Sequence, residues 1–404
     1  MSELSYLEKL LDGAEVEWKS LSELASLRRG RVMSKGYFVD NIGEYPVYSS
    51  QTANSGMIGS IDTFDFDGEF VSWTTDGANA GTVFYRKGKF SITNVCGLIK
   101  INDNSPLNYK YLFYWLSIEA KSHVYSGMGN PKLMSHQVEK IPVPIPCPNN
   151  PEKSLAIQSE IVRILDKFTA LTAELTAELT ARKKQYNYYR DQLLSFEEGA
   201  APFYPLGQKE VGEFIRGGSF QKKDFTKSGI GCIHYGQIFT HYGTYANKTK
   251  TFVSESLAQK CRKAKTGNLV IATTSENDDD VCKAVAWLGT EDIAVSSDAC
   301  IYRHNLNPKY VSYFFQTESF QSQKRQYITG TKVRRVNADN LAKILIPVPS
   351  QEEQTRIVDI LDKFDLLTSS ISQGLPREIE LRQKQYEYYR DLLFSFPKPD
   401  SVTN

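Results

Sequence analysis

Basic side chains gather in three stretches of this 404-residue chain, in part within glycine- and threonine-rich loops. Residues 319–338 hold five basic residues and no acid, residues 27–38 hold four and no acid, and residues 248–265 hold six beside the single acid Glu255. Arginine forks match the edge of guanine and lysines match phosphates, so loops of this kind are suited to contact with DNA. A solvated charged loop would explain any one stretch, but their recurrence favours a nucleic-acid interface.

The chain as a whole offers little attraction for a polyanion. Its 48 lysines and arginines are balanced by 47 acidic residues, which leaves a net charge of +1. Any contact with nucleic acid must therefore be local. One acidic turn, Glu276–Asp280, stands against the interpretation, and we expect it either to point away from phosphates or to accept a hydrogen bond from the amino group of cytosine.

No stretch of the sequence has the residues of a catalytic or metal site. The nearest approach to a phosphate-binding Walker loop, at 212–218, lacks the lysine and the hydroxyl residue that follow it. The Asn/Asp-Pro-Pro-aromatic motif of enzymes that methylate amino groups is absent. The five histidines form no i, i+4 pair, and the six cysteines are never closer than 18 positions, which excludes CxxC sites. We expect a chain that is not an enzyme, binds no metal and keeps reduced, mostly buried thiols.

Three sequence blocks occur twice in the same order, which indicates an internal duplication. They are IPVP at 141–144 and 346–349, IVRILDKF at 161–168 against IVDILDKF at 357–364, and RKKQYNYYRDQLLSF at 182–196 against RQKQYEYYRDLLFSF at 382–396. Between the blocks the halves keep only a faint common plan. Leu21 followed by Arg29-Gly30 in the first half corresponds to Leu206 followed by Arg216-Gly217 in the second. A predicted strand that ends at Thr75 corresponds to one that ends at Thr274. The segment 6–13 faintly echoes the YYRDQLLSF block, so the repeat is circular.

The repeated blocks predict long helices. Apolar residues recur at three- and four-residue steps after Asn150-Pro151, a good cap and first-turn pair. About 45 residues would give a helix on the order of 65 Å long, which suits a spacer. The second copy begins with the capping-box spacing of Ser350 and Glu353, continues with the stripe Ile357, Ile360, Phe364, Leu367 and Ile371, and breaks at 374–376. There Pro376 can take the first position of a second helix.

The two predicted helices invite an antiparallel coiled coil. The alternative is that each helix packs only on its own domain. The repeat also conserves the exposed-looking Lys-Gln-Tyr and Tyr-Tyr-Arg-Asp faces, so we favour a docking surface for two copies of one partner. The residues expected there are Tyr186, Tyr189, Arg190, Tyr386, Tyr389 and Arg390, although a simple coiled-coil seam would explain the tyrosines equally well.

A tandem tetrapeptide, Thr-Ala-Glu-Leu at 172–175 and 176–179, lies between the blocks of the first helix. The intervening segment spans 13 residues in the first copy (169–181) and 17 in the second (365–381). The difference of four residues is about one helical turn, or ~6 Å. The segment therefore resembles an adjustable ruler.

These patterns predict an α+β chain with two variable domains and two constant helical regions. The expected divisions are an N-terminal segment at 1–14 that completes the circular repeat, a first domain at 15–150, a central helical spacer at 151–200, a second domain at 201–350 and a C-terminal helical region at 351–404. No apolar run approaches the ~18 residues of a membrane helix, and the polar, charged segment 1–13 lacks the apolar core that a signal peptide needs. We expect a cytoplasmic protein.

In these blocks, in the tandem tetrapeptide and in the alternation of variable domains with constant helices, the whole chain resembles the specificity subunit of type I restriction-modification enzymes, within the type IC group. The resemblance implies two target recognition domains that each read one half of an asymmetric, bipartite DNA sequence. It also implies an antiparallel coiled coil that sets the gap and binds two modification subunits, which carry S-adenosylmethionine and methylate adenine. Further restriction subunits would carry ATP- and Mg-dependent translocation and cleavage.

The resemblance transfers little to single residues, so the DNA contacts are predicted from the loops themselves. The candidates are Gly330, Thr331, Lys332, Arg334 and Arg335 with their counterparts Asn130, Lys132 and His136, then the strand-end residues Thr74, Thr75, Thr273, Thr274 and Ser275, and for phosphates Arg29, Arg31, Lys222 and Lys223.

Two other classes of function remain open at this point. A scaffold that bridges two copies of a protein partner would show no salt-sensitive DNA binding. An autonomous DNA methyltransferase or nuclease would need cofactor and metal motifs that the sequence lacks.

Overall fold

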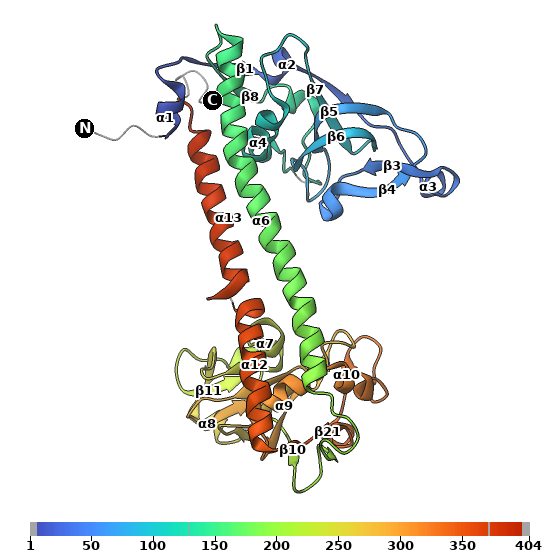
Figure 1. Ribbon diagram of the computed structural model, residues 1–404, viewed down its shortest axis with the longest axis vertical. Helices are drawn as coiled ribbons and strands as arrows, with labels where there is room; N and C mark the ends of the chain where they lie inside the picture. Colours follow the sequence, from blue (N-terminus) through green and yellow to red (C-terminus); the bar gives the residue numbers. More distant parts are fainter. Residues whose placement is uncertain (1–5, 128, 371, 398–404) are drawn as a thin grey trace, which may run out of the picture. The chain divides into compact units, whose positions relative to one another are not determined.

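The structure, a computed structural model, describes residues 6–127, 129–370 and 372–397. Ile371 of the predicted stripe and the outer ends of both terminal segments lie outside the described residues. The chain divides into unit 1, residues 1–174 and 380–404, and unit 2, residues 175–379. Both units combine sheets with helices (Figure 1), so the predicted α+β class is confirmed.

Unit 1 is built on a six-stranded sheet of order β2-β7-β5-β6-β3-β4. The pairs are antiparallel except β3 with β6, which run parallel. The strands are β1 (Val16–Ser20), β2 (Ala25–Arg29), β3 (Ile42–Tyr48), β4 (Met57–Ile61), β5 (Phe66–Thr74), β6 (Val83–Ile92), β7 (Cys96–Ile101) and β8 (Pro142–Pro146). The short helices are α1 (Tyr6–Leu11), α2 (Leu21–Leu24), α3 (Lys35–Asp40), α4 (Tyr109–Glu119) and α5 (Ser135–Val138).

Unit 2 has a five-stranded sheet of order β10-β19-β15-β17-β12 and a four-stranded sheet of order β13-β11-β18-β14. Its strands are β9 (Phe203–Pro205), β10 (Gly212–Arg216), β11 (Ile230–Ile233), β12 (Tyr245–Ala246), β13 (Thr251–Val253), β14 (Lys263–Ala264), β15 (Leu269–Ala272), β16 (Thr274–Ser275), β17 (Ala284–Trp287), β18 (Ile293–Val295), β19 (Ala299–His304), β20 (Arg334–Arg335) and β21 (Leu345–Pro347). Its helices are α7 (Tyr235–Thr240), α8 (Glu255–Ala258), α9 (Pro308–Phe314), α10 (Glu318–Arg325), α11 (Ala338–Leu341) and α12 (Gln351–Ser369).

The IPVP blocks form strands, which the sequence analysis did not foresee. The last three residues of the first block lie in β8, which pairs with β1, and the first two residues of the second block lie in β21, which pairs with β9. Proline cannot donate to a sheet, so prolines are tolerated where a strand uses only alternate N–H groups at an edge. Both pairs form separate two-stranded sheets, where one side of each strand needs no partner.

One short helix in each unit docks onto the long helix that follows it, through the same contacts. In unit 1 the Lys110 ammonium and the Tyr114 hydroxyl both bind Asp166, at 2.6 and 2.7 Å. In unit 2 Lys309 and Tyr313 bind Asp362, at 2.5 and 2.7 Å. The aspartates belong to the repeated ILDKF block, and in both copies this residue holds a short helix of the domain onto the long helix.

A buried glutamine on each long helix completes this anchor. The Gln158 side chain accepts from the backbone N–H of Asn108 at 2.8 Å and donates to the Pro106 carbonyl at 2.7 Å. In unit 2 Gln354 accepts from the Asn307 N–H and donates to the Pro349 carbonyl, both at 2.9 Å. Each glutamine thus satisfies backbone groups that would otherwise be buried without partners.

The constant blocks form long helices, as predicted. Helix α6 (Pro151–Leu193) has 43 residues and begins at the expected proline, where the Asn150 side chain accepts from the Lys153 N–H at 3.0 Å. Its first part belongs to unit 1, where Phe168 stacks on Tyr389 of α13 (Gly374–Leu393) at 5.4 Å. Its second part belongs to unit 2, where Tyr189 stacks on Phe364 of α12 at 5.8 Å. The order of these contacts is antiparallel.

The second constant region is broken between Ser369 and Gly374, close to the predicted position. Gly374 adopts φ +76°, and a Cβ there would lie 2.4 Å from the Leu366 carbonyl oxygen, so only glycine fits. The new helix begins at this glycine. Pro376 therefore lies in its first turn rather than at its first position, where it still needs no N–H partner.

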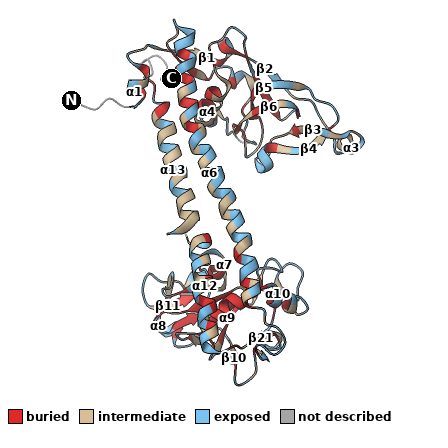
Figure 2. Ribbon diagram, in the orientation of Figure 1, coloured by how far each residue is buried: buried red, intermediate tan, exposed pale blue. Residues whose placement is uncertain are grey.

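The end of the described chain is part of the core of unit 1. Leu393, Phe394 and Phe396 are buried there, and the Phe394 ring lies 5.2 Å from that of Tyr111. Figure 2 shows that buried residues gather in the sheet-containing parts of the units, whereas the middle of α6 is intermediate or exposed. The Trp18 indole donates to the Pro397 carbonyl at 2.9 Å. Residues from both ends of the sequence thus build one domain.

All six cysteines are free thiols, five of them buried. Among the described residues, no helix is long and apolar enough to span a membrane.

Candidate nucleic-acid interface

Each unit carries a short hairpin before its IPVP strand. In unit 1 the backbones of Tyr125 and Lys132 exchange two hydrogen bonds of 2.8 and 3.0 Å, and in unit 2 those of Thr329 and Arg335 exchange two of 2.9 Å. The hairpins therefore have the same closure. The predicted contact residues that they expose are Asn130, Lys132, Gly330, Thr331, Lys332 and Arg335, and His136 is exposed on the adjoining α5.

The hairpins lie against the strand ends that the sequence analysis selected. Lys132 forms a bridge with Asp76, and Arg335 pairs with Thr274 in the short β16–β20 ladder. The next residue of each hairpin donates its N–H to a strand-end carbonyl, Thr75 in unit 1 and Thr273 in unit 2. Thr75 is thus equivalent to Thr273, and the predicted equivalence with Thr274 is wrong by one residue.

In unit 1 two cations share one carboxylate at this junction. Asp76 lies 3.8 Å from the Arg29 guanidinium and 3.9 Å from the Lys132 ammonium. All three side chains are partly exposed, so their mutual attraction is screened by water and adds little to stability. The cluster leaves one net positive charge at the foot of the hairpin.

In unit 2 the equivalent position lines a cavity of about 310 Å³. Arg216, Thr273, Asp298 and Arg335 are among its lining residues. Arg334 points elsewhere, because its guanidinium is paired with Asp278 at 2.8 Å. Through this ion pair the acidic turn at 276–280 contacts the basic hairpin.

Several predicted contact residues lie below the surface. Thr74, Thr75 and Thr274 are buried. The Thr75 hydroxyl donates to the Asp76 carboxylate at 2.5 Å, and the Thr74 hydroxyl donates to the Asn79 carbonyl. These side chains support the loop from beneath, while Thr273 and Ser275 are partly exposed.

Lys324, counted above in a basic stretch, is a structural residue. Its side chain is 1% exposed, and its ammonium donates to the carbonyls of Asp279 and Val281 at 3.1 and 2.9 Å. Burial lowers the pKa of the ammonium. It holds the acidic turn in place and is not available to a phosphate.

The other predicted phosphate contacts differ in whether protein groups already bind their charged side chains. Arg31 is bound by the Asp65 carboxylate at 3.0 Å and by the Tyr37 hydroxyl at 3.2 Å. Lys222 and Lys223 are exposed in the short 3-10 helix Lys222–Asp224 of unit 2. The two lysines are therefore the more accessible.

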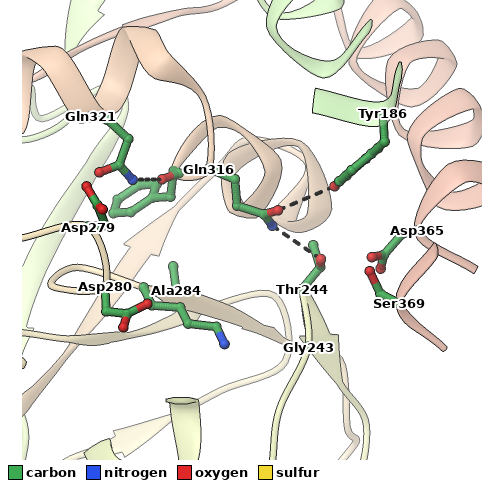
Figure 3. Close-up of a pocket in the computed structure, with 12 residues that line it drawn as sticks. Tyr186, Gly243, Thr244, Asp279, Asp280, Ala284, Gln316, Gln321, Asp365 and Ser369 are labelled. Carbon is green, nitrogen blue, oxygen red and sulfur yellow. Dashed lines mark hydrogen bonds between the residues drawn. The ribbon is translucent and has the colours of Figure 1, made fainter. Parts of the chain in front are cut away.

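Tyr186 of α6, one of the predicted partner contacts, is 6% exposed. It lines a cavity of about 390 Å³ in unit 2 (Figure 3). Its hydroxyl donates to the Gln316 side chain at 3.3 Å, and that amide donates to the Thr244 hydroxyl at 3.2 Å. Burial raises the pKa of the phenol. Figure 3 places Asp365 and Ser369 of α12 beside this chain of hydrogen bonds.

The first tyrosine of each Tyr-Tyr pair, Tyr188 and Tyr388, was not predicted and is the more exposed of its pair, although the predicted Tyr189 is also 42% exposed. Tyr188 is 62% exposed and Tyr388 is 65% exposed. Each packs edge-on against the next tyrosine, at 5.4 and 5.3 Å. Their signal in the sequence was the repeated Tyr-Tyr pair. Of the other predicted partner residues, Arg190 is buried over the Tyr186 ring, and Tyr386 and Arg390 are partly buried.

Among the described residues, no three histidine, cysteine or acidic side chains are grouped so that they could hold a metal ion.

Comparison with known proteins gives the family. The model of the type I restriction modification DNA specificity domain matches residues 14–182 and 206–381. The chain is 41% identical, over the whole of both chains, to the type I restriction enzyme EcoR124I/EcoR124II specificity subunit of Escherichia coli. It is 32% identical to a putative type I restriction enzyme specificity subunit of Haemophilus influenzae, S.HindORF215P, over 97% of this chain and 98% of that one.

Solved structures share the fold. The specificity subunit of the type I system of M. genitalium has a TM-score of 0.55 at 14% identity, over 96% of this chain and 98% of that one. A chain from a type I restriction-modification system, solved for its complex assembly and conformational transition, has a TM-score of 0.60 at 13% identity, over 94% and 97%. The resemblance found in the repeated blocks is confirmed: the chain belongs to the type I restriction-modification specificity family, as the non-catalytic subunit that gives such a system its DNA specificity.

Proposed function

We propose that this chain reads an asymmetric, bipartite DNA target, one half with residues 15–150 and the other with residues 201–350. The observation that carries the proposal is that the two units share the backbone arrangement of a hairpin but present different side chains on it. Both units place a hairpin against the same strand end, closed by the same backbone bonds. The hairpins differ in sequence, Ser-Gly-Met-Gly-Asn-Pro at 126–131 against Gly-Thr-Lys-Val-Arg at 330–334. Equal frames that present unequal side chains suit two unequal half-sites.

The proposed DNA contacts are the exposed members of the predicted set. Base and backbone contacts come from the hairpins, through Asn130, Lys132, Lys332 and Arg335 with Gly330 and Thr331. Lys222 and Lys223 contact phosphates, as do Arg29 and His136 beside the unit 1 hairpin. The buried Thr74, Thr75 and Thr274 fix the hairpins rather than touch bases, and Arg31 contacts a phosphate only by exchanging Asp65 for it.

The helical regions 151–200 and 351–404, with the segment 1–14, form the spacer and the docking surface for two modification subunits. The docking face is repeated, because Tyr188 and Tyr388 are equally exposed and equally packed on their neighbours. Large, exposed, restrained aromatic side chains are frequent energetic centres of protein interfaces. Tyr189 and Tyr389 pack against these tyrosines. Arg190 and Arg390 lie over the rings of Tyr186 and Tyr386, which anchor the helices to their domains.

The chemistry of the complex lies in the partner subunits. S-adenosylmethionine belongs to the modification subunits, and ATP and Mg to the restriction subunits, which join through the complex in the cytoplasm.

The test is to co-express the chain with its modification subunit in a methylation-free host and to map N6-methyladenine across the genome by single-molecule sequencing. Methylation at one asymmetric sequence, split by a gap of fixed length, is the expected result. A stable complex without any such motif would refute the proposal and favour a scaffold that only joins partner subunits.

A further inference from the structure

We propose that Arg216, Asp298 and Arg335 of unit 2 form a cluster that reads a G·C base pair. The inference rests on the proposed function and deepens it, because it assigns both the residues and the base pair. Arg216 and Asp298 are not among the contacts predicted from the sequence.

Sheet register shows that Arg216 has a counterpart in unit 1. Arg29 ends β2 opposite Gly97, and Arg216 ends β10 opposite Cys300. Gly97 and Cys300 in turn face the equivalent strand residues Trp73 and Ile271. Because Lys132 and Arg335 are also equivalent, each unit places two basic side chains around the same strand end.

The backbone that carries the unit 2 cluster is held on several sides. The residue after Arg216, Gly217, approaches the sheet so closely that a Cβ would lie 2.0 Å from the Ser296 carbonyl oxygen. The Asp298 carbonyl accepts from both the N–H and the hydroxyl of Thr273, each at 3.0 Å. Arg335 is fixed by its ladder with Thr274 and by Thr329. Side chains on such fixed backbone can discriminate between bases because little reorganisation is needed on binding.

The charges differ between the units in a way that matters for recognition. In unit 1 the acid at the strand end, Asp76, is already paired with both cations. In unit 2 the equivalent residue is Thr274, and the acid is supplied from another loop by Asp298, at the position of Val95. Within the described part of the chain, Arg216, Asp298 and Arg335 make no salt bridge, and all three line the 310 Å³ cavity. Two guanidinium groups, which donate hydrogen bonds, and one carboxylate, which accepts them, therefore line the same cavity without a salt-bridge partner among the described residues.

This combination matches one base pair in the major groove. Guanine offers two acceptors, N7 and O6, to an arginine fork, and cytosine offers its N4 amino group to a carboxylate. Adenine offers the fork only N7, with an amino donor where guanine has O6, and thymine offers Asp298 the acceptor O4 where cytosine has a donor. The cluster thus favours G·C over A·T through both bases of the pair.

The methylation map described above supplies the test, with wild-type chain and the variants Asp298→Asn, Arg335→Gln and Arg216→Gln. The matched control is Glu291→Gln, which removes an exposed carboxylate elsewhere in unit 2. We expect a specified G·C pair in the half-site that the variants alter. Selectivity at that pair should fall on the order of 5- to 150-fold, since a good base contact contributes about that factor. The other half-site and the control should keep the wild-type pattern.

Two results would overturn the inference while leaving the bipartite target intact. One is a wild-type motif in which neither half specifies a G·C pair, which needs no variant and so does not depend on variant folding. The other is unchanged selectivity in all three variants when methylation at the intact half-site shows that the complex has formed. Absence of any bipartite motif in the wild type would instead refute the proposed function itself.

Discussion

Replacing Gln354 by leucine should loosen the docking helix α9 of unit 2 while leaving α4 of unit 1 unchanged. Gln354 is 1% exposed and binds two backbone groups, the Asn307 N–H and the Pro349 carbonyl, both at 2.9 Å. Leucine fills a similar volume but strands both groups, at about 1–3 kcal/mol each. The gain from burying leucine offsets about 2 kcal/mol of the combined loss, which leaves a net loss of about 2 kcal/mol and at most about 4 kcal/mol. That loss is a large share of the stability of an ordinary domain, about 5–15 kcal/mol.

The assay is amide hydrogen exchange on the full chain, under conditions in which local opening is rapidly reversed. Amides of residues 309–314 should exchange about 30-fold faster in the variant, and at most about 1000-fold faster, because each 1.4 kcal/mol is about tenfold. Helix α4 provides a reference in the same molecule, and Gln383→Leu is the matched control because Gln383 is exposed and bonded only along its own helix. Equal exchange of α9 in the wild type and the Gln354 variant would show that the glutamine does not anchor the helix.

Three further predictions test the spacer, the docking face and the response to pH. Adding or removing one Thr-Ala-Glu-Leu unit within 172–179 changes α6 by about 6 Å and should alter the gap between methylated half-sites by one or two base pairs, since the rise is ~3.4 Å per pair; an unaltered gap would refute the ruler. The double change Tyr188→Ala and Tyr388→Ala should weaken co-purification of the modification subunit at least tenfold without lowering the melting temperature of the chain; full retention of the partner would place the docking face elsewhere. Burial lowers the pKa of His304 to about 4 from its ordinary 6.5, so the neutral ring stabilises the fold above pH 6.5 and up to about 3 kcal/mol is lost as pH falls towards 4; denaturant unfolding of His304→Phe should show a smaller loss over this range, and an identical loss would contradict the assignment.

The duplication and the long helices could be predicted because repeated blocks and helix-capping residues are visible in short stretches of sequence. The repeated ILDKF and YYRD blocks fix the helices, and Asn150-Pro151 fixes the first residue of α6. The anchors could not be placed in the same way, since helical periodicity does not say which residue meets a second helix. Gln158 and Gln354 nonetheless stand three residues before each repeated block, and their recurrence was the available signal.

The candidate interface was predicted at the level of segments rather than side chains. The hairpins and strand ends do lie together, but the Thr-Thr pairs were matched one residue out of register, because identical letters do not determine which residue faces a neighbouring strand. Composition also cannot distinguish an exposed lysine from Lys324, whose buried ammonium binds two carbonyls. Arg216 was matched to Arg29 in the sequence, yet its role emerges only beside Asp298.

The insertion of Leu393, Phe394 and Phe396 into the core of unit 1 has a consequence for how the protein is made. A ribosome adds about 5–20 residues per second, so the strands of unit 1 emerge on the order of ten seconds or more before the side chains that complete their core. During that interval the apolar surface of Tyr111 and Trp115 that Phe394 covers is exposed to solvent and prone to aggregation. The nascent first domain must then be shielded by a chaperone, or remain only loosely formed, until synthesis approaches its end. A premature stop before residue 393 would consequently harm the domain made first.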